Sequence, residues 1–189
     1  MSEPIDDGYP VVVRLAGRRV LIVGGGQIAL RKARGVLAAG AAVTVVSPDV
    51  VPELVGLPTV VIHLRRFEAG DLDGAMLVIA ATNDPDAQQQ IFEEGERRGI
   101  FVNAVDDPDR CSFVLPAVHR RGPVIIAVST QGRSPTLAGR LRDLLADAMP
   151  ADIEALAAEL AEQRRAIQAR GESTEDVEWP DPLARRSVG

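Results

Sequence analysis

A glycine-rich turn between an apolar run and a helical pattern limits the folds open to this chain more than any other feature. The run RRVLIVG (residues 18–24) is rich in β-branched residues and almost wholly apolar, as expected of a strand covered on both faces. Residues 25–40, GGQIALRKARGVLAAG, then place apolar side chains on one helical face and end at Gly40, a natural C-cap. A buried strand, a glycine turn and an amphipathic helix together predict the first unit of a parallel, doubly wound sheet.

The same alternation of strands and helices continues to about residue 112. A helix is expected at residues 84–98. Further strands are expected at residues 41–47, 59–66 (a weaker pattern), 75–82 and 100–105. The first part of the chain, residues 1–112, is therefore predicted to be an α/β, Rossmann-type domain.

The pattern changes after residue 112. Two strand-like runs, SFVLPAV (112–118) and GPVIIAVS (122–129), are separated by HRRGP, which is typical of a turn. A helix follows over 134–149, with Ser134 as N-cap and Pro135 in the first helical position, where its missing N–H costs nothing.

The sequence thus predicts a small α+β segment after the Rossmann-type domain, followed by a short helical C-terminal region. We expect the segment at 113–150 to form a dimer interface, because its apolar runs are long for free sheet edges. The C-terminal region, 151–189, is expected to contain one helix over 151–169. The remaining polar residues, 171–189, are expected to be mobile or loosely docked.

Composition excludes several classes of function. Aromatic residues make up only 3% of the 189 residues and the net charge is -6, which argues against a nucleic-acid partner. No apolar run reaches the roughly 20 residues of a membrane helix, and the N-terminus MSEPIDDGYP is unlike a signal peptide. With a single cysteine, the chain is expected to be cytoplasmic.

The glycine turn matches the dinucleotide fingerprint G-x-G-x-x-A at Gly24, Gly26 and Ala29. Its glycines permit a tight turn and close approach to a pyrophosphate, while the helix N-terminus attracts negative charge. The alternative is a glycine-rich turn in a fold that binds no nucleotide. The residues expected to contact the cofactor here are Gly24, Gly25, Gly26, Gln27, Ile28 and Ala29.

The second half of the fingerprint is incomplete. An acidic residue should follow the second strand to hold the ribose hydroxyls, but the chain has Ser47-Pro48-Asp49, in which Ser47 or Asp49 could do part of that work. No arginine lies between 35 and 64 to bind a 2′-phosphate, which favours NAD over NADP. We also expect cofactor contacts from Pro48 and, after the fourth strand, from Thr82 and Asn83.

The remaining candidates have less specific patterns. Asn83 and Asp84 can equally cap the following helix. His63 is expected to be structural or superficial, and His119 to be an exposed turn residue. No motif makes Cys111 a nucleophile, and no spacing of His and Cys predicts a preformed metal site.

Hydroxyl groups, a glycine and an arginine precede the helix that begins near residue 134. The segment STQGRSP (129–135) can form a cradle for a carboxylate or phosphate, or be an ordinary capped helix start. The apolar run at 100–105 is followed by Asp106, Asp107 and Asp109. This acidic cluster is either a functional site or a solvent-exposed turn.

Four segments together resemble one known family, the precorrin-2 dehydrogenases, which include the N-terminal domain of siroheme synthase and small dehydrogenase/ferrochelatases. The resemblance covers about residues 8–150 and includes several motifs in the same order. The segments are YPVVVRLAGRRVLIVGGGQIALRKARGVLAAGAAVTVVSP, LVIAATND, VNAVDDPDRCSFVLPA and GPVIIAVSTQGRSPTLAGRLR.

The resemblance implies a homodimer that oxidises precorrin-2 to sirohydrochlorin with NAD and, in some members, inserts Fe²⁺ to give siroheme. It also implies that Asp106 is the functional aspartate of both dehydrogenation and metal insertion. A carboxylate can accept the proton that the reaction releases, or guide a metal ion. Asp107 and Asp109, on either side of Pro108, are expected to belong to the turn. The chain departs from the family in having Gln131-Gly132 where Gly-Gly is common, and in its short C-terminal helical region.

Because the substrate carries many carboxylates, cationic groups and backbone N–H groups are expected to anchor it. Thr130 occupies a position where the family has a hydroxyl that lines the site. The full set of candidate substrate contacts is Arg110, Ser129, Thr130, Gly132, Arg133 and Ser134.

Two other functions stay open from the sequence. The domain could be a nucleotide- or tetrapyrrole-binding module without turnover. A generic NAD(P) reductase is disfavoured, because Tyr9 and Lys32 are the chain's only tyrosine and lysine and cannot form a Tyr-x-x-x-Lys pair.

Overall fold

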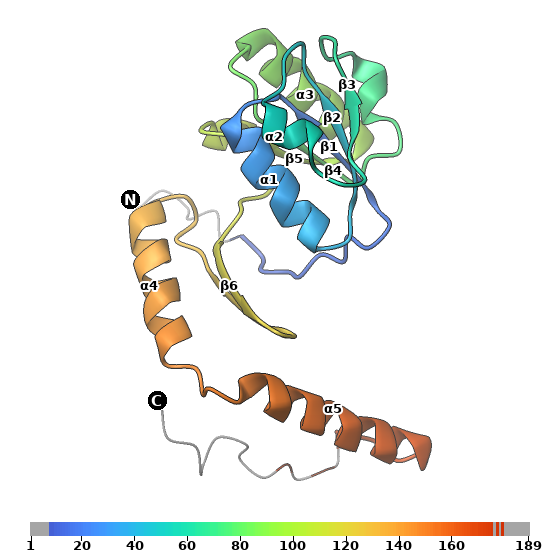
Figure 1. The fold of residues 1–189 in the computed structure, drawn as a ribbon, viewed down its shortest axis with the longest axis vertical. Coiled ribbons are helices and arrows are strands. Elements are labelled where there is room, and N and C mark those ends of the chain that lie inside the picture. Colours follow the sequence, from blue (N-terminus) through green and yellow to red (C-terminus); the bar gives the residue numbers. More distant parts are fainter. Residues whose placement is uncertain (1–7, 176, 178, 180–189) are drawn as a thin grey trace, which may run out of the picture. The chain divides into compact units, whose positions relative to one another are not determined.

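The computed structural model describes residues 8–175, 177 and 179, which divide into two compact units, residues 1–114 and 115–189. Figure 1 shows the helices and strands of both units. The division expected from the sequence, with boundaries after residues 112 and 150, stays a prediction. So does the mobility of residues 171–189, because most of that stretch lies outside the described residues.

The first unit is built on a five-stranded parallel sheet, as the sequence predicts. The strands are β1 (Arg19–Val23), β2 (Ala42–Val46), β3 (Val61–His63), β4 (Leu77–Ala80) and β5 (Phe101–Ala104). Their order is β3-β2-β1-β4-β5, so the chain starts in the centre, builds outward to β3 and then returns to the other side of β1. The carboxyl ends of all five strands therefore lie along one edge, where such sheets bind ligands.

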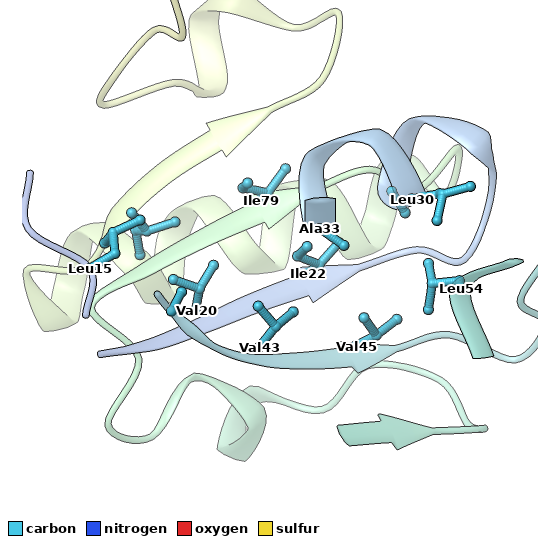
Figure 2. Packing of buried hydrophobic residues seen from close by; sticks show 12 residues of the cluster. Leu15, Val20, Ile22, Leu30, Ala33, Val43, Val45, Leu54 and Ile79 are labelled. Atoms are coloured by element: carbon cyan, nitrogen blue, oxygen red, sulfur yellow. The ribbon is translucent and has the colours of Figure 1, made fainter. Parts of the chain in front are cut away.

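Alternate residues of the central strands enter two separate hydrophobic clusters, one on each face of the sheet. Val20 and Ile22 of β1 pack with Leu30 and Ala33 of α1 (Gln27–Ala38), as Figure 2 shows. Leu21 and Val23 of the same strand belong to the second cluster, which includes Ile91 of α3 (Pro85–Arg98). Burial on both faces explains why these strands are continuous apolar runs.

The ends of α3 follow from local chemistry. The Asp84 carboxylate accepts hydrogen bonds from the N–H groups of Asp86 and Ala87 at 3.1 and 3.2 Å, and Pro85 occupies the first turn. Gly99 ends the helix in the left-handed conformation, with φ of 67°. Asp84 is therefore the helix cap that the sequence allows.

Three short helices are absent from the sequence predictions. They are α2 (Pro52–Val55) and two 3₁₀ helices, at Ala69–Leu72 and Pro108–Arg110. Each is three or four residues long, which is too short to produce a recognisable 3.6-residue period.

The second unit contains a two-stranded antiparallel sheet and two helices. Strands β6 (Ala117–Arg121) and β7 (Val124–Val128) form a hairpin, followed by α4 (Pro135–Asp147) and α5 (Ile153–Ala169). The Ser134 side chain accepts the Leu137 N–H, which confirms the predicted N-cap.

The predicted strand at 112–118 is wrong. Ser112 instead returns to β5, where its N–H donates to the Val102 carbonyl at 2.8 Å. Pro116 has no N–H to donate, so the ladder with β7 begins after it, at Ala117. The turn shortens to Gly122 and the proline after it, and His119 lies within β6 rather than in a turn, with a buried Nε2 atom.

Among the described residues, no helix has both the length and the apolar character required to cross a bilayer. His63, the last residue of β3, is exposed, as the sequence predicts for a superficial histidine.

An ion pair between a buried aspartate and a partly exposed arginine stabilises the connection between β3 and β4. The Asp71 carboxylate is bound by both terminal nitrogens of Arg65, at 2.6 and 2.8 Å, and accepts the Glu68 N–H at 2.9 Å. The hydrogen bonds from Arg65 lower the pKa of Asp71 further than its burial raises it. The ionised form is therefore favoured in the folded state.

We expect Asp71→Asn to destabilise the first unit by about 1–2 kcal/mol at neutral pH, because Arg65 loses its charged acceptor. A carboxyl whose pKa is depressed by folding stabilises the protein above about pH 4 and loses that contribution as pH falls through its folded pKa. Chemical denaturation from pH 7 to pH 3 should show the two proteins converging in acid. Glu172→Gln, which removes the acid of an exposed ion pair with Arg170, is the control and should have a smaller effect. A constant difference across the pH range would contradict this account.

Candidate functional site

The loop after β1 approaches its neighbours too closely for any side chain. A Cβ atom on Gly24 would lie 2.1 Å from the Ala81 carbonyl oxygen, and one on Gly25 would lie 1.9 Å from the carbonyl oxygen of Asp49. Gly24 also has a φ of 119°, which L-residues rarely adopt. These two glycines bring the loops that follow β1, β2 and β4 together at the carboxyl edge.

Gly26 differs from the two glycines before it. A Cβ atom there would have no atom within 4 Å, so its surroundings are open space. Gly26 is also the N-cap of α1, and the first turn of that helix contains no acidic residue and no side-chain cap. Free N–H groups of the first turn therefore face a space that can accommodate an anionic group.

The third position of the fingerprint, Ala29, has a packing function. It is completely buried in the cluster between α1 and the sheet. A small side chain there lets the helix lie close to β1, which orients the helix N-terminus toward the edge. Gln27 and Ile28 lie between these positions, in the first turn of α1, and Ile28 lines the cavity described below.

The turn after β2 is stabilised by its own serine. Ser47 is buried, and its hydroxyl donates to the Asp49 carbonyl at 2.7 Å. Pro48 and Asp49 are exposed beside it. In this turn the Asp49 side chain is therefore exposed, while the Ser47 side chain stabilises the backbone conformation.

Two arginines follow β3, just beyond the stretch in which the sequence has none. Arg65 binds Asp71 with both terminal nitrogens, and Arg66 lies 3.6 Å from an Asp84 carboxylate oxygen. Both guanidinium groups therefore already have acidic partners. The preference for NAD over NADP stays a prediction from the sequence, because the Arg66 side chain is 86% exposed.

A cavity of about 310 Å³ lies at the carboxyl edge of the sheet in the first unit. Its walls come from the first turn of α1, the loop after β4, the start of α3 and the end of β5. The lining residues are Ile28, Ala81, Thr82, Asn83, Gln88, Val105, Asp106 and Asp107. Four of the residues predicted to form the site thus meet here: Ile28, Thr82, Asn83 and Asp106.

Asp106 has an unusual backbone conformation. It is exposed at the cavity and has a φ of 61°, in the left-handed region that costs energy for residues other than glycine. Aspartate and asparagine tolerate this region better than most residues. Non-glycine residues held in it often belong to functional sites.

The loop that carries Asp106 is fastened at both ends to β5 and its neighbour. The Val105 N–H donates to the Ala80 carbonyl at 2.9 Å, and Ser112 exchanges hydrogen bonds with Val102. Asn103, which is buried, donates to the Phe113 carbonyl at 3.0 Å. These hydrogen bonds close the base of the loop between them.

The other acids of the loop differ from Asp106. Asp107 forms an ion pair with Arg110, and the Arg110 Nε group donates to the Gln89 side chain at 2.7 Å. Asp109 is exposed in the short helix. Arg110, a predicted substrate contact, therefore already has partners in the loop and on α3, and its partner Asp107 also lines the cavity.

Cys111 has the properties of a structural thiol. Its sulfur lies 3.2 Å from the carbonyl oxygens of Ala104 and Asp107. Burial raises the pKa of the Cys111 thiol, although the hydrogen bond to Ala104 opposes that effect. A thiol that stays protonated is a poor nucleophile.

The other predicted substrate contacts belong to the second unit. Thr130 Oγ1 accepts the Ser134 N–H and donates to the Ser134 carbonyl, both at 3.0 Å, and the Ser129 hydroxyl accepts the Gln131 N–H. Gln131 and Gly132 both have positive φ, at 52° and 78°. Local hydrogen bonds therefore use the hydroxyl groups of this turn, while the Arg133 side chain is exposed.

Gln88 is a polar cavity residue that was not predicted from the sequence. It lies one turn into α3, and its side-chain amide donates to the Thr82 carbonyl at 2.6 Å. Its position four residues after the Asp84 cap was the available signal, because that spacing returns to the same side of the helix start. In the part of the chain that the structure describes, no group of three or more His, Cys, Asp or Glu side chains could hold a metal ion.

The chain is similar to proteins of siroheme biosynthesis. Residues 11–117 match a family described as "Putative NAD(P)-binding", and residues 121–148 match one described as "Sirohaem biosynthesis protein central". Siroheme synthase 2 of Aeromonas hydrophila is 43% identical over 152 residues, which are 80% of this chain and 32% of that protein. Siroheme synthase of Thioalkalivibrio sulfidiphilus is 44% identical, over 89% of this chain and 35% of its own length.

The chain thus spans about a third of the length of the siroheme synthases that it matches. For one solved structure, the matched region is a similar share of both chains. SirC, precorrin-2 dehydrogenase, has a TM-score of 0.71 and 30% identity, over 89% of this chain and 84% of that one.

The open space at Gly26 yields a test of dinucleotide binding. We expect Gly26→Asp to weaken binding at least about 100-fold, because a carboxylate would occupy the space that a pyrophosphate needs and repel it. The fold should be unaffected, since Gly26 has an ordinary φ of -82°. Calorimetric titration with NAD and thermal unfolding measure the two effects. Gly35→Asp, at another glycine of α1 with open surroundings, is the matched control and should bind normally.

Proposed function

Because the chain belongs to the precorrin-2 dehydrogenase family, which includes the corresponding part of siroheme synthases, we propose that it oxidises precorrin-2 to sirohydrochlorin with NAD. The observation that carries this proposal is the cavity at the carboxyl edge. There the exposed Asp106 carboxylate shares a space with Ile28 of the fingerprint helix and with Thr82 and Asn83.

The residues present fit an NAD molecule. Open space over Gly26 and the N-terminus of α1 suit the pyrophosphate, and the exposed turn at Pro48 and Asp49 suits the adenosine ribose. Thr82 and Asn83 then lie where the cavity would receive the other half of the dinucleotide. When bound, NAD would accept the hydride that the macrocycle loses.

Asp106 supplies the complementary half of the reaction. Removal of two hydrogens from precorrin-2 as a hydride and a proton requires an acceptor for the proton. The Asp106 carboxylate is exposed at the cavity, on a loop whose base is closed by hydrogen bonds. It can therefore accept this proton without a rearrangement of the backbone. Arg110, Arg133 and the turn at 129–134 are the proposed anchors for substrate carboxylates.

One further feature of the proposal, iron insertion, comes from the family. Insertion of Fe²⁺ into the product would use Asp106 to receive pyrrole protons and guide the metal ion as a substrate. A cytoplasmic location stays a prediction from the sequence. The alternative is a binding module without turnover, which the following experiment separates from an enzyme.

We expect Asp106→Asn to lower the rate of precorrin-2 oxidation about 10²- to 10⁴-fold, the usual cost of removing a general base. NAD affinity should stay within a few-fold. Asparagine tolerates the left-handed φ of Asp106, so the loop keeps its shape. Anaerobic incubation with precorrin-2 and NAD, followed through NADH absorbance and through iron insertion, gives both activities.

Asp109→Asn is the control for this experiment, because it removes an acid of the same loop that is exposed and does not line the cavity. If Asp106→Asn kept both activities, Asp106 would be an ordinary turn residue. If the unmodified protein bound NAD and precorrin-2 without producing NADH, the binding-module alternative would replace the enzyme.

The exposed apolar surface of the second unit supports a homodimer. On the hairpin, Val118 and Ile125 are exposed, and on α4 Leu137, Leu144 and Leu145 are 51%, 65% and 47% exposed. Such a concentration of large apolar side chains is unusual for a surface that stays in water. A second copy of the chain, which offers the same surface, would cover it.

We expect light scattering at micromolar concentration to give roughly 40 kDa, twice the 20.1 kDa of one chain. Leu144→Lys combined with Ile125→Lys should shift the protein toward the monomer, because two charges would be buried without partners. Val55→Lys, at an equally exposed residue of the first unit, should leave the mass unchanged. A 20 kDa species for the unmodified protein would refute the dimer.

A further inference from the structure

Three consecutive glutamines lie near the start of α3, and each has different surroundings. Gln88 lines the cavity, and its side-chain Nε2 donates to the Thr82 carbonyl at 2.6 Å. Gln89 accepts a hydrogen bond from the Arg110 Nε group at 2.7 Å. Gln90 is exposed and does not line the cavity. Of the three, Gln88 is therefore the one whose amide can meet a ligand in the cavity.

The hydrogen bond to Thr82 fixes the orientation of the Gln88 amide. A carbonyl group can only accept a hydrogen bond, so the nitrogen of the amide must be the atom that faces Thr82. The remaining polar atom, Gln88 Oε1, has no hydrogen-bond donor among the residues that the structure describes. Because this oxygen is itself only an acceptor, a ligand that pairs with it must supply an N–H or O–H group.

The strand order indicates which part of a bound dinucleotide meets Gln88. The exposed turn at 48–49 follows β2, the open space at Gly26 follows β1, and Asp106 follows β5. Strands β2, β1, β4 and β5 are successive neighbours in the sheet, and α3 begins after β4. Gln88 thus lies between the space for the pyrophosphate and the proposed proton acceptor, where the nicotinamide has to lie in order to receive a hydride.

The nicotinamide carboxamide is the ligand group that best matches a single acceptor in this place, because its nitrogen carries two N–H donors. Ionised substrate carboxylates can only accept, and the pyrrole N–H groups of a tetrapyrrole point into its own centre. Asn83 also lines the cavity, but it is exposed and no hydrogen bond within the described ranges orients its amide. Gln88 is therefore the amide that the fold has already oriented for a donor.

We propose that Gln88 binds the carboxamide of the nicotinamide: its Oε1 accepts an N–H of that amide, while its Nε2 stays on the Thr82 carbonyl. The inference rests on the proposed function, because it assigns a contact of the cofactor in that site. Such a hydrogen bond would restrict rotation of the nicotinamide ring and keep it oriented for hydride transfer. Gln88 is thus a cofactor-binding residue and moves no proton itself.

Three ligands separate this contact from the rest of the binding site without any turnover. NAD has the complete carboxamide, and ADP-ribose lacks the nicotinamide altogether. The acetylpyridine analogue of NAD carries a methyl ketone in place of the carboxamide, so it has no N–H to donate. For the unmodified protein, we expect calorimetric titration to give a Kd about five- to tenfold higher for the analogue than for NAD, which is the usual effect of one hydrogen bond.

Two substitutions at Gln88 isolate the contribution of Oε1. Gln88→Met and Gln88→Glu have side chains of similar length and both lose the donor to the Thr82 carbonyl, but only glutamate keeps an acceptor. We expect Gln88→Met to bind NAD and the analogue within about twofold of each other, and Gln88→Glu to keep the preference for NAD. Gln90→Met is the matched control and should behave as the unmodified protein. In both methionine variants the Kd of ADP-ribose should change less than about twofold.

The outcomes separate this inference from the proposed function. If the unmodified protein bound NAD and the analogue equally, if Gln88→Met kept the preference for NAD, or if Gln88→Glu lost it, Oε1 would not bind the carboxamide. An equal loss of affinity for NAD and for ADP-ribose in Gln88→Met would also overturn the inference, since a contact with ribose or a displaced Thr82 loop would then explain the loss. If the unmodified protein showed the preference but produced no NADH from precorrin-2, the proposed function would fail and the Gln88 contact would stand.

Discussion

The site depends on how closely the loop after β1 approaches the loops after β2 and β4. The backbone at Gly24 and Gly25 occupies positions where a Cβ atom would overlap a carbonyl oxygen of a neighbouring loop. These contacts bring three parts of the sequence, separated by whole strands and helices, to one edge of the sheet. A substituted residue at either position would separate the loops and move the N-terminus of α1 away from the cavity.

The same edge holds its acidic loop by a different means. Around Asp106 the constraint consists of hydrogen bonds: from the Asn103 side chain to the Phe113 carbonyl, between Ser112 and Val102, and from Cys111 to Ala104. These bonds lie at the base of the loop and leave its tip at the cavity. At the loop after β1, the absence of side chains therefore allows the close approach. At the loop after β5, small polar side chains satisfy buried backbone groups.

The sequence predicted the parallel sheet, its helices and the family, and all three are confirmed. The β1 unit was accessible because a long apolar run, three glycines and an amphipathic helix all indicate the same structure. The hairpin strand was misplaced because Ser112 and Phe113 pair with β5 through long-range hydrogen bonds that a local pattern does not contain. The Gly and Pro of HRRGP suggested a turn, but His119 and Arg121 belong to β6, which packs against α4.

The candidate site was also predictable from the sequence only in part. Ile28, Thr82, Asn83 and Asp106 were predictable because each follows directly from a strand end or from the fingerprint, and parallel strand ends meet at one edge. Gln88 was not, since it lies within a helix and reaches the site only through the direction in which that helix leaves the sheet. For the turn at 129–134, local hydrogen bonds satisfy the hydroxyl groups, and its function as a substrate anchor stays a prediction.

The backbone conformation at Asp106 is a separate argument that its side chain has a function. A φ of 61° costs a residue with a Cβ on the order of 1 kcal/mol, and glycine would avoid that cost. The fastened base of the loop imposes this conformation, so the cost is part of the folded state. Asp106 is exposed at the cavity, and its side chain forms no hydrogen bond or ion pair with any of the residues that the structure describes. A function in which the carboxylate itself takes part is the explanation that accounts for both its conformation and its chemistry.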